Sequence, residues 1–350
     1  MPDIKNIKIS PQMLTQIAEL DKFNGAWTGF ARRRPEQLEV LKKVSTIESI
    51  GSSNRIEGNK LSDDEVEKLL SRIDKKSFNT RDEEEVAGYA ELMNIIFDDY
   101  SLIPLSENHI KQLHQILLQY VAKDERHRGE YKKLSNSVAA FDSNGKQIGI
   151  VFETATPFDT PRLMEEIIEW GRKNLDDPFL HPLIVIGVFV VHFLSIHPFQ
   201  DGNGRLSRAL TTMLLLKKAY GFVAYSSMES IIEASKEGYY RALRRTQKDI
   251  WSDKVDYEPW LSFFLTSLVK QKNHLEDKIG AMTTDDAKLS RNARTILALF
   301  ENRREWTSRE ISAELDMNIE TAKKSLKSLV DKGYLAKQGA TKGAWYEKTE

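Results

Sequence analysis

Residues 182–196 form one of the most apolar stretches of the chain. Their valine and isoleucine side chains would suit a strand, but fifteen residues is longer than most strands, so we expect a buried helix. The uninterrupted apolar run within it, at 183–191, has nine residues and is too short to cross a bilayer. The polar sequence HPFQDGNGRLSR follows directly at 197–208, and a buried helix that ends in this way needs a reason.

The composition sets the frame around this helix. A chain of 350 residues with 40% hydrophobic content can bury a large core, and we expect two or more domains. The net charge of -1 gives no overall signal for a nucleic-acid or membrane surface. The absence of cysteine excludes disulfides, thiolate metal sites and cysteine nucleophiles. Because the N-terminus also lacks a signal-peptide pattern, we expect a soluble, cytoplasmic protein.

Helix signals dominate the chain, which predicts a mainly α fold. Two capping boxes predict helix starts, Ser62 with Glu65 and Thr80 with Glu83. The exception to the helical pattern is the stretch at 138–158, where Asn-Gly between two extended runs predicts a β-hairpin. We expect N-terminal helices over 1–50, a core over 51–275 and a separate domain over 276–350.

The last 75 residues have the order of a winged-helix domain, with three short helices followed by a possible two-stranded wing around Gly339 and Gly343. Lys323, Lys324 and Lys327 of the third helix could contact phosphates. From 285 to 350 there are 13 Lys and Arg against 11 Asp and Glu, a net of only +2. Since DNA-binding domains are usually strongly basic, we favour a scaffold or dimerisation module over DNA binding.

The sequence at 197–208 combines residue types that suit phosphate chemistry. Pro198 ends the preceding helix at His197, which places the imidazole at the helix tip. Gly202-Asn203-Gly204 can form an anion-binding turn of backbone N–H groups at the start of the next helix. Arg205 and Arg208 share one face of that helix and could bind phosphate. Each feature alone is more often structural, and only their joint occurrence favours a site.

Asp201 needs a separate explanation, because a carboxylate repels phosphates unless a cation lies between them. Mg²⁺ is bound in this way, through one or two carboxylates together with substrate phosphates. His197 titrates near neutral pH and can take a proton from a hydroxyl. The segment therefore offers a base, a metal ligand and a phosphate cradle.

The segment matches the signature of the Fic family, His-Pro-Phe-x-Asp/Glu-Gly-Asn-Gly-Arg-x-x-Arg, at all nine specified positions. The hairpin at 138–158 lies where that family has its flap, and RHRGEYKK at 126–133 resembles the family's lead-in. The resemblance covers about residues 50–265. It implies a Fic-type helical bundle with a β-hairpin flap, followed here by the small winged-helix-like domain.

The resemblance also implies a reaction, AMPylation, with ATP and Mg²⁺. His197 would deprotonate a Ser, Thr or Tyr hydroxyl of a target protein, and Asp201 would hold Mg²⁺ against the α- and β-phosphates. The backbone of 202–204 would cradle those phosphates, while Arg205 contacts the β-phosphate and Arg208 the γ-phosphate. AMP is transferred and pyrophosphate leaves. The target could be another protein or this chain itself.

Two further details follow from the resemblance. Family members that transfer phosphate carry Lys in place of the second glycine, so Gly204 argues against that reaction. GYYRAL at 238–243 is similar to the family's adenine-side helix, so Tyr239 or Tyr240 could stack on the base. Aromatic packing in a core helix explains these two residues equally well.

A second motif, SNRIEGN at 53–59, resembles the family's inhibitory pattern through Ser53, Glu57 and Gly58. By itself it would be a helix C-terminus that ends in glycine. Beside a complete Fic signature we favour the regulatory interpretation, in which Glu57 pairs with Arg208 and blocks the γ-phosphate. Its position before the core indicates the class with an N-terminal inhibitory helix.

Other functions remain open at this point. Glu57 could position water to remove AMP from a modified protein. The donor could be UTP or CDP-choline instead of ATP. A different class of function is a DNA-binding regulator, with the winged helix as its active part and the Fic core as sensor. The extra helices at both ends offer surface for a homodimer.

Overall fold

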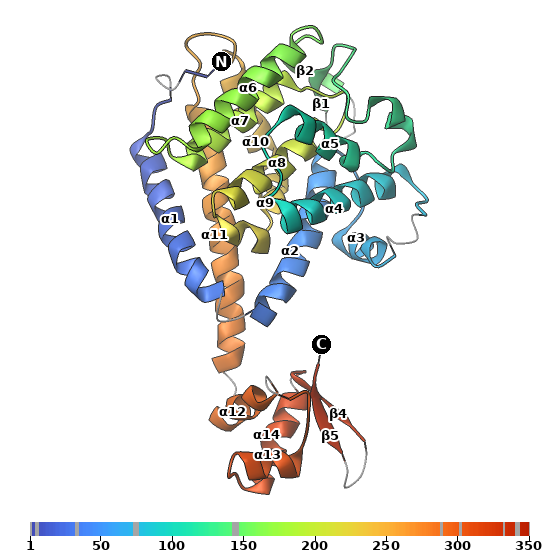
Figure 1. The fold of residues 1–350 in the computed structure, drawn as a ribbon, viewed down its shortest axis with the longest axis vertical. Coiled ribbons are helices and arrows are strands. Elements are labelled where there is room, and N and C mark those ends of the chain that lie inside the picture. The colour runs from blue at the N-terminus through green and yellow to red at the C-terminus, as the bar shows by residue number, and fades with distance from the viewer. Residues whose placement is uncertain are drawn as a thin grey trace. The chain divides into compact units, whose positions relative to one another are not determined.

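The computed structural model describes residues 2–3, 7–31, 35–72, 77–141, 147–287, 290–300, 303–331, 333–339 and 344–349. Its contacts divide the chain into two compact units, Met1–Leu275 and Glu276–Glu350, which are described separately below. Helices make up most of both units, as the sequence predicts (Figure 1).

The helices of the first unit run in sequence order, and the last of them continues past its boundary. They are α1 (Pro11–Ala31), α2 (Pro35–Ile56), α3 (Asp63–Leu70), α4 (Arg81–Asp99), α5 (Glu107–Leu117), η3 (Ala122–His127), α6 (Thr160–Leu175), α7 (Pro182–Ile196), α8 (Asn203–Lys217), η4 (Gly221–Tyr225), α9 (Met228–Ala234), α10 (Lys236–Gln247) and α11 (Glu258–Ala287).

Helix α7 is the centre of this unit, and the prediction of a buried helix over 182–196 is confirmed. Every residue of α7 after Pro182 is buried. The helix packs against α6 on one side and α8 on another. Almost all of α8 up to Leu216 is buried too. Both helices are buried, and only residues 197–202 separate the end of α7 from the start of α8. This short loop therefore lies beside the core. Among the described helices, none combines the length and the apolar character that a membrane span requires.

The helix starts show where local sequence signals hold. Ser62 forms the predicted capping box with Glu65. Thr80 accepts from the Glu83 N–H as predicted. The other predicted bond of this capping box, from the Thr80 N–H to the Glu83 side chain, is wrong. The Glu83 carboxylate instead accepts from the Asn79 N–H, at 2.6 Å, and pairs with Arg72, at 2.7 Å. The carboxylate therefore binds the N–H of the residue before the cap, and Arg72 lies beside it.

The predicted hairpin is present as β1 (Ser137–Phe141) and β2 (Gln147–Glu153), which pair antiparallel from Ser137 with Glu153 to Phe141 with Gln147. The second strand ends at Glu153 and does not reach 158. The Asn-Gly turn at 144–145 lies outside the described residues. The hairpin thus leaves and rejoins the helical core at residues 136 and 154.

The second unit contains α12 (Arg291–Leu299), α13 (Ser308–Glu314), α14 (Ile319–Asp331), β3 (Glu305–Thr307), β4 (Leu335–Gln338) and β5 (Trp345–Lys348). The three predicted helices and the paired β4 and β5 agree with the expected element order. The sequence analysis missed β3, which pairs with β5 and extends the wing to three strands. A core that includes Ile296, Ile311 and Leu326 holds the unit together.

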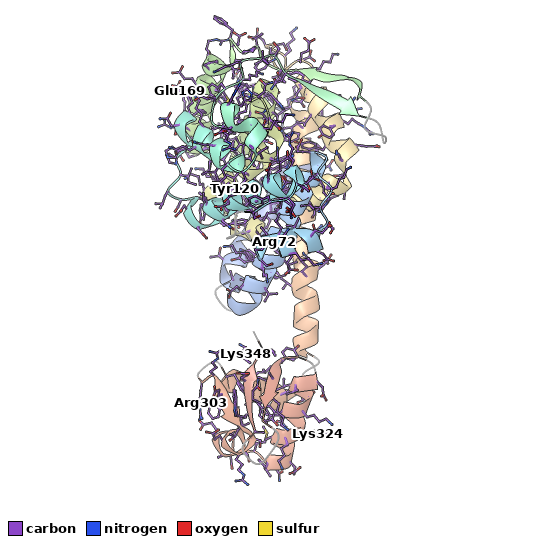
Figure 2. The ribbon with its side chains drawn as sticks, turned by 90° about the vertical axis from the view of Figure 1, so that its right-hand side faces the viewer. Arg72, Tyr120, Glu169, Arg303, Lys324 and Lys348 are labelled. Carbon is purple, nitrogen blue, oxygen red and sulfur yellow. The ribbon has the colours of Figure 1, made fainter. Side chains whose placement is uncertain are left out.

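The charges of the second unit are dispersed. Lys323 pairs with Glu320 at 2.8 Å, and Arg303 pairs with Glu310 at 2.7 Å. Arg303, Lys324 and Lys348 lie on different sides of the unit (Figure 2). DNA binding by this unit, and its assignment as a winged helix, stay predictions, and the spread of its charge gives DNA binding no support.

Candidate active site

His197 lies directly after α7 in the left-handed conformation, with φ of 51°. Its backbone N–H still donates to the Phe193 carbonyl. The Nδ1 atom lies 3.4 Å from the Leu194 carbonyl oxygen, which favours the tautomer that leaves Nε2 as a proton acceptor. Burial and then the nearby Lys132 charge lower the pKa of His197 to about 4. The imidazole is therefore neutral at physiological pH, as a general base must be.

The loop that follows, residues 197–204, is called the His197 loop below, and two side chains fix its middle. The Asn203 amide spans it, since Oδ1 accepts from the Phe199 N–H at 2.9 Å and Nδ2 donates to the Phe199 carbonyl at 2.7 Å. The His114 ring stacks on Phe199 with 3.8 Å between ring centroids. The sequence analysis expected Asn203 to contribute through its backbone, but its side chain has a structural task as well.

His114 is a residue that the sequence analysis missed. It is completely buried on α5, and its Nδ1 accepts from the Gly129 N–H at 3.0 Å. Its Nε2 must then carry the proton that is donated to the Asp201 carbonyl, also at 3.0 Å. Burial lowers the pKa of His114 to about 4, so the ring stays neutral.

Asp201 is surrounded by donors. Its carboxylate accepts from the Gly202 N–H at 2.6 Å and lies 3.1 Å from Arg81 and 3.6 Å from Arg205. Burial by itself would raise the pKa of Asp201, but Arg205, the Gly202 N–H and Arg81 together hold the pKa below its usual value. The side chain is thus an anion. The sequence analysis did not anticipate Arg81, which begins α4.

The first turn of α8 forms the floor of the site. Gly202 precedes it with φ of 77°, a backbone conformation that glycine adopts without strain. The backbone N–H groups of such a turn point out of the helix and carry partial positive charge. A Cβ atom at Gly204 would collide with the Glu57 carboxylate, so the absence of a side chain there lets Glu57 approach the helix.

Both predicted arginines are buried on α8, and both already have partners. Arg205 lies 3.3 Å from Glu85 and 3.5 Å from the Asn54 side chain. Arg208 donates through Nε to the Ser53 hydroxyl and through Nη2 to the Ser53 carbonyl, each at 2.9 Å. Burial opposes the charge of Arg208, but the Glu57 carboxylate holds its pKa above the usual value.

The structure brings Glu57 and Arg208 together, with 2.8 Å between Oε1 and Nη2. Glu57 belongs to residues 53–58, called the Glu57 turn below, which closes α2 with Gly58 at φ of 102°. The Glu57 side chain is 34% exposed, while that of Arg208 is 5% exposed. The pair therefore joins a buried cation to a carboxylate that solvent can reach.

Arg55 anchors this turn, and the sequence analysis gave it no role. Its guanidinium donates two hydrogen bonds to the carboxylate of Glu233 on α9, from Nε at 2.7 Å and from Nη2 at 3.0 Å. Its Nη1 also donates to the Asp63 side chain at 2.9 Å and to the Leu61 carbonyl at 3.0 Å. The end of α2 is thus tied to α9 and to the start of α3.

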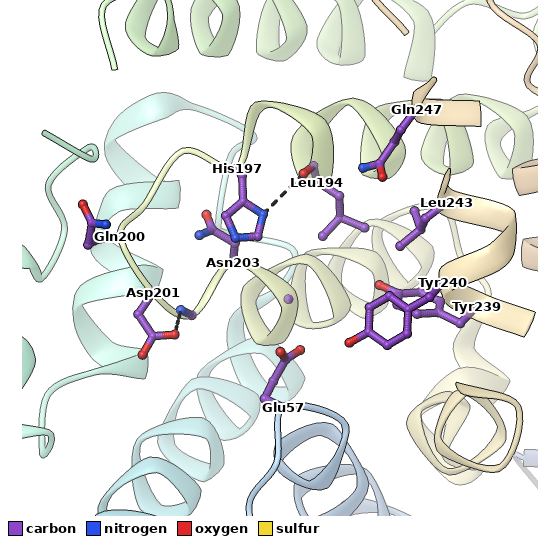
Figure 3. Close-up of a pocket in the computed structure, with 12 residues that line it drawn as sticks. Glu57, Leu194, His197, Gln200, Asp201, Asn203, Tyr239, Tyr240, Leu243 and Gln247 are labelled. Atoms are coloured by element: carbon purple, nitrogen blue, oxygen red, sulfur yellow. Dashed lines mark hydrogen bonds between the residues drawn. The ribbon is translucent and has the colours of Figure 1, made fainter. Parts of the chain in front are cut away.

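One pocket with a cavity volume of about 110 Å³ lies beside the His197 loop, and neither Arg205 nor Arg208 is among its lining residues (Figure 3). Glu57, His197, Asp201 and residues 202–204 line one part of it, and the rest is lined by Leu194, Gln200, Tyr239, Tyr240, Leu243 and Gln247. Most of the predicted site residues therefore meet in one place, although they come from distant parts of the chain.

The two tyrosines of α10 differ in their surroundings. Tyr239 is 3% exposed and packs against Trp260 and Phe263, which agrees with the core-packing alternative. Tyr240 is half-buried and lines the same pocket. Burial raises the pKa of Tyr239 to about 12, so its hydroxyl stays protonated. Base stacking by either ring stays a prediction.

No cluster of three or more metal-ligating side chains occurs among the residues that the structure describes. Asp201 is thus a single carboxylate. A single carboxylate is compatible with Mg²⁺ that is bound mainly by substrate phosphates and water, but it is not a dedicated metal site.

Comparison with known proteins finds a family whose model matches part of this pocket. A model of the Fic/DOC family matches residues 104–215. The matched range includes α5, the hairpin, α7, most of α8 and the His197 loop. The Glu57 turn lies outside it.

Two relatives share part of the sequence. The "Probable protein adenylyltransferase" of Aquifex aeolicus is 31% identical over 109 residues, which cover 31% of this chain and 33% of that protein. The "Protein adenylyltransferase Fic" of Drosophila grimshawi is 24% identical over 267 residues, which cover 73% of this chain and 52% of that protein. The chain thus spans about a third and about half of the length of these relatives.

A solved structure gives the same fold. A Fic family protein from Desulfovibrio desulfuricans superimposes with a TM-score of 0.63 at 22% identity, and the match covers 98% of each chain. The likeness therefore extends over the residues of both units.

Proposed function

The chain belongs to the Fic family, and on this premise we propose that it is a protein adenylyltransferase held in check by its own Glu57. The observation that carries the proposal is the pocket itself. A neutral histidine, the amide-rich start of α8 and an ion-paired glutamate converge there. The substrates are ATP and a protein hydroxyl on a Ser, Thr or Tyr side chain.

His197 is the general base of this reaction. Its neutral imidazole accepts the hydroxyl proton at Nε2 while the hydroxyl oxygen attacks the α-phosphorus of ATP. The new bond joins this oxygen to the α-phosphorus, and the bond from the α-phosphorus to the bridging oxygen breaks. Pyrophosphate leaves, and AMP stays on the target as a phosphodiester.

The phosphates are bound by the first turn of α8 and by the two arginines. Arg205 Nε and Arg208 Nη1 are buried and have no hydrogen-bond partner within the described part of the chain. Buried donors of this kind favour an anionic partner. Gly204 keeps this surface free of a side chain and leaves no lysine there, which supports AMP transfer over phosphate transfer.

Mg²⁺ fits the anionic Asp201 carboxylate. When bound between Asp201 and the phosphates, the ion would neutralise charge that develops on the phosphate oxygens. The Arg81 and Arg205 guanidinium groups now balance the charge of Asp201, at 3.1 and 3.6 Å. They keep the carboxylate ionised.

Glu57 inhibits the reaction by occupying Arg208. The γ-phosphate would need the same guanidinium that Glu57 contacts at 2.8 Å. A hydrogen bond to a charged group contributes roughly 1.5–3 kcal/mol, so release of Glu57 should favour productive ATP binding about ten- to a hundredfold. The Ser53 contacts stay in place, and they hold Arg208 ready for the phosphate.

The test uses ATP labelled at the α-phosphate, with Mg²⁺, and reads label on this protein and on the proteins of a lysate. We expect more label with Glu57→Gly than with wild type, and none with His197→Ala. The exposed residues His274 and Glu130 provide matched controls, His274→Ala and Glu130→Gly, which should behave as wild type. Equal labelling by wild type and Glu57→Gly would contradict the inhibition.

Removal of AMP is the second candidate, because Glu57 lines the same pocket as His197 and could orient water there. Pre-labelled target protein distinguishes the two directions. If wild type releases AMP from it and Glu57→Gly does not, hydrolysis is the activity that Glu57 serves. Competition by unlabelled UTP or CDP-choline in the same assay tests the identity of the donor.

A further inference from the structure

Lys132 is a buried lysine that the reaction described above does not use. It lies between η3 and β1, in the segment RHRGEYKK, and is 3% exposed. A lysine is rarely buried to this extent unless its ammonium group has partners. Burial lowers the pKa of Lys132 to about 8.

Three neutral oxygens satisfy the ammonium group. Lys132 Nζ donates to the Thr154 hydroxyl at 2.8 Å, and to the Asn136 side-chain oxygen and the Ile196 carbonyl at 2.9 Å each. Three N–H donors thus meet three acceptors from three parts of the chain. Thr154 and Asn136 are the residues at the base of the hairpin, directly beyond β2 and before β1.

The backbone of Lys132 adds a fourth contact. Its N–H donates to the Pro198 carbonyl at 2.9 Å. The same residue therefore binds the carbonyl groups on both sides of His197, that of Ile196 and that of Pro198. His197 has a φ of 51°, which a residue with a Cβ atom adopts only at an energetic cost. Contacts on both flanking peptides are a direct way to maintain that conformation.

The charge of Lys132 also suits its position. Ile196 is the last residue of α7, where the helix dipole favours a cation. The groups that face His197 are Lys132 from this segment, Glu57 from the Glu57 turn and Asp201 from its own loop. Of these, Lys132 disfavours a second positive charge on the imidazole, while the two carboxylates favour it.

We propose that Lys132 is a positioning residue for adenylyl transfer, which holds His197 in its left-handed conformation through both flanking carbonyls and joins this loop to the base of the hairpin. The inference rests on the proposed function. It assigns to Lys132 the orientation of the base toward the hydroxyl, and no contact with ATP. Through Asn136 and Thr154 the same ammonium group also contacts the base of the hairpin.

The test compares Lys132→Met, Lys132→Arg and Lys133→Met, each in the active Glu57→Gly protein. Lys133 is the exposed neighbour, so Lys133→Met is the matched control. A misplaced base should lower kcat of Lys132→Met by about a hundredfold, while the KM for ATP stays within about threefold. Lys132→Arg keeps the charge but not the compact geometry, so its kcat should fall less than that of Lys132→Met.

The pH profile separates this role from a purely structural one. Without the Lys132 charge, His197 should take up a proton more readily, so the acidic limb of kcat/KM should move to higher pH by at least ~0.5 unit. A kcat for Lys132→Met within about threefold of the parent, or an acidic limb that does not move, would overturn the proposal.

Two further measurements test the role of Lys132 if the variant does not fold or if the protein transfers no AMP. If Lys132→Met does not fold, Thr154→Val removes one acceptor of the ammonium group, and a lowered kcat at unchanged KM is again expected. If Glu57→Gly itself transfers no AMP, the proposed function fails, and Lys132 is then tested by NMR titration of His197. A changed backbone chemical shift of His197 in a folded Lys132→Met supports the positioning role without any activity, and a backbone shift and a pKa that both stay unchanged contradict it.

Discussion

The His197 loop and the Glu57 turn meet at the first turn of α8 (Figure 3). Different kinds of bond hold the two segments. Buried groups with neutral partners hold the His197 loop, through the Asn203 amide, the His114 ring and the Lys132 ammonium. Charged groups hold the Glu57 turn, since Arg208 contacts both Glu57 and Ser53 and Arg55 pairs with Glu233.

The difference matches what each segment must do in the proposed reaction. Buried hydrogen bonds are costly to break, because the partner is left without water or protein to replace the bond. The Glu57–Arg208 pair differs, because its carboxylate is 34% exposed and an arriving anion can take its place on the guanidinium. A base must stay in place through every cycle, whereas an inhibitor must leave when the γ-phosphate arrives. The first segment is therefore built to persist and the second to be displaced.

The largest effect should come from breaking the His197 loop at its centre. Asn203→Ala removes the only side chain that binds both the N–H and the carbonyl of Phe199 among the described residues. The buried Phe199 N–H then lacks a partner, which should lower the free energy of unfolding by about 1–3 kcal/mol. Transfer should fall at least a hundredfold, because the loop that carries His197 loses its shape.

Chemical denaturation and labelled transfer measure these two effects. Asn94→Ala, at an exposed position of α4, serves as the control and should change neither. An Asn203→Ala protein of normal stability and activity would mean that the Asn136 amide, which also donates to the Phe199 carbonyl at 2.8 Å, holds the loop alone.

A pH change should weaken the His197 loop more than the Glu57 turn. His114 and His197 have folded-state pKa values lowered to about 4, below the ordinary value near 6.5. Their contribution to stability is complete above pH 6.5 and is lost as the pH falls toward 4, because the unfolded chain binds protons that the folded chain does not. Each should contribute a loss of roughly 2 kcal/mol between pH 6.5 and 5.

Denaturation at a series of pH values tests this linkage. His114→Gln should reduce the slope of unfolding free energy against pH by about one proton over that range, while His274→Gln at an exposed position should not. Residues 276–350 contain no histidine, so the second unit adds nothing to the slope through this residue type. A His114→Gln slope equal to that of wild type would show that the buried ring is not the origin.

The comparison also explains what the sequence could predict. The buried helix over 182–196 and the hairpin follow from patterns in neighbouring residues, and the structure has both. The Glu57 contact with Arg208 was expected only from the family resemblance, since 151 residues separate the two in sequence. The strand β3 was missed because a three-residue strand carries almost no pattern of its own.

The residues that brace the His197 loop were missed for a different reason. His114 lies on the apolar face of a helix, where its spacing from Ile110 and Leu117 indicates burial but no partner. Lys132 lies within the lead-in segment, yet nothing in that segment tells which carbonyl its ammonium reaches. Bonds between distant segments depend on the tertiary fold, so a single sequence gives no signal for them.

The smallest effect concerns Arg55, which should restrain the Glu57 turn without touching the pocket residues of α8. Arg55→Gln removes the paired contacts to Glu233 and the contact to Asp63. The side chains of Arg55 and Glu233 are 22% and 31% exposed, so solvent already weakens this pair. We expect transfer to rise about two- to tenfold, less than with Glu57→Gly, since Glu57 itself remains.

The matched control is Arg72→Gln, which removes a 2.7 Å pair with Glu83 away from the turn and should leave transfer unchanged. In the Glu57→Gly protein, Arg55→Gln should add nothing, because the residue that it restrains is gone. A rise in both backgrounds would mean that Arg55 acts on the site by a route other than Glu57. No rise in either background would mean that the contacts with Arg208 hold the Glu57 turn without Arg55. A buried group would then hold this turn, as buried groups hold the His197 loop.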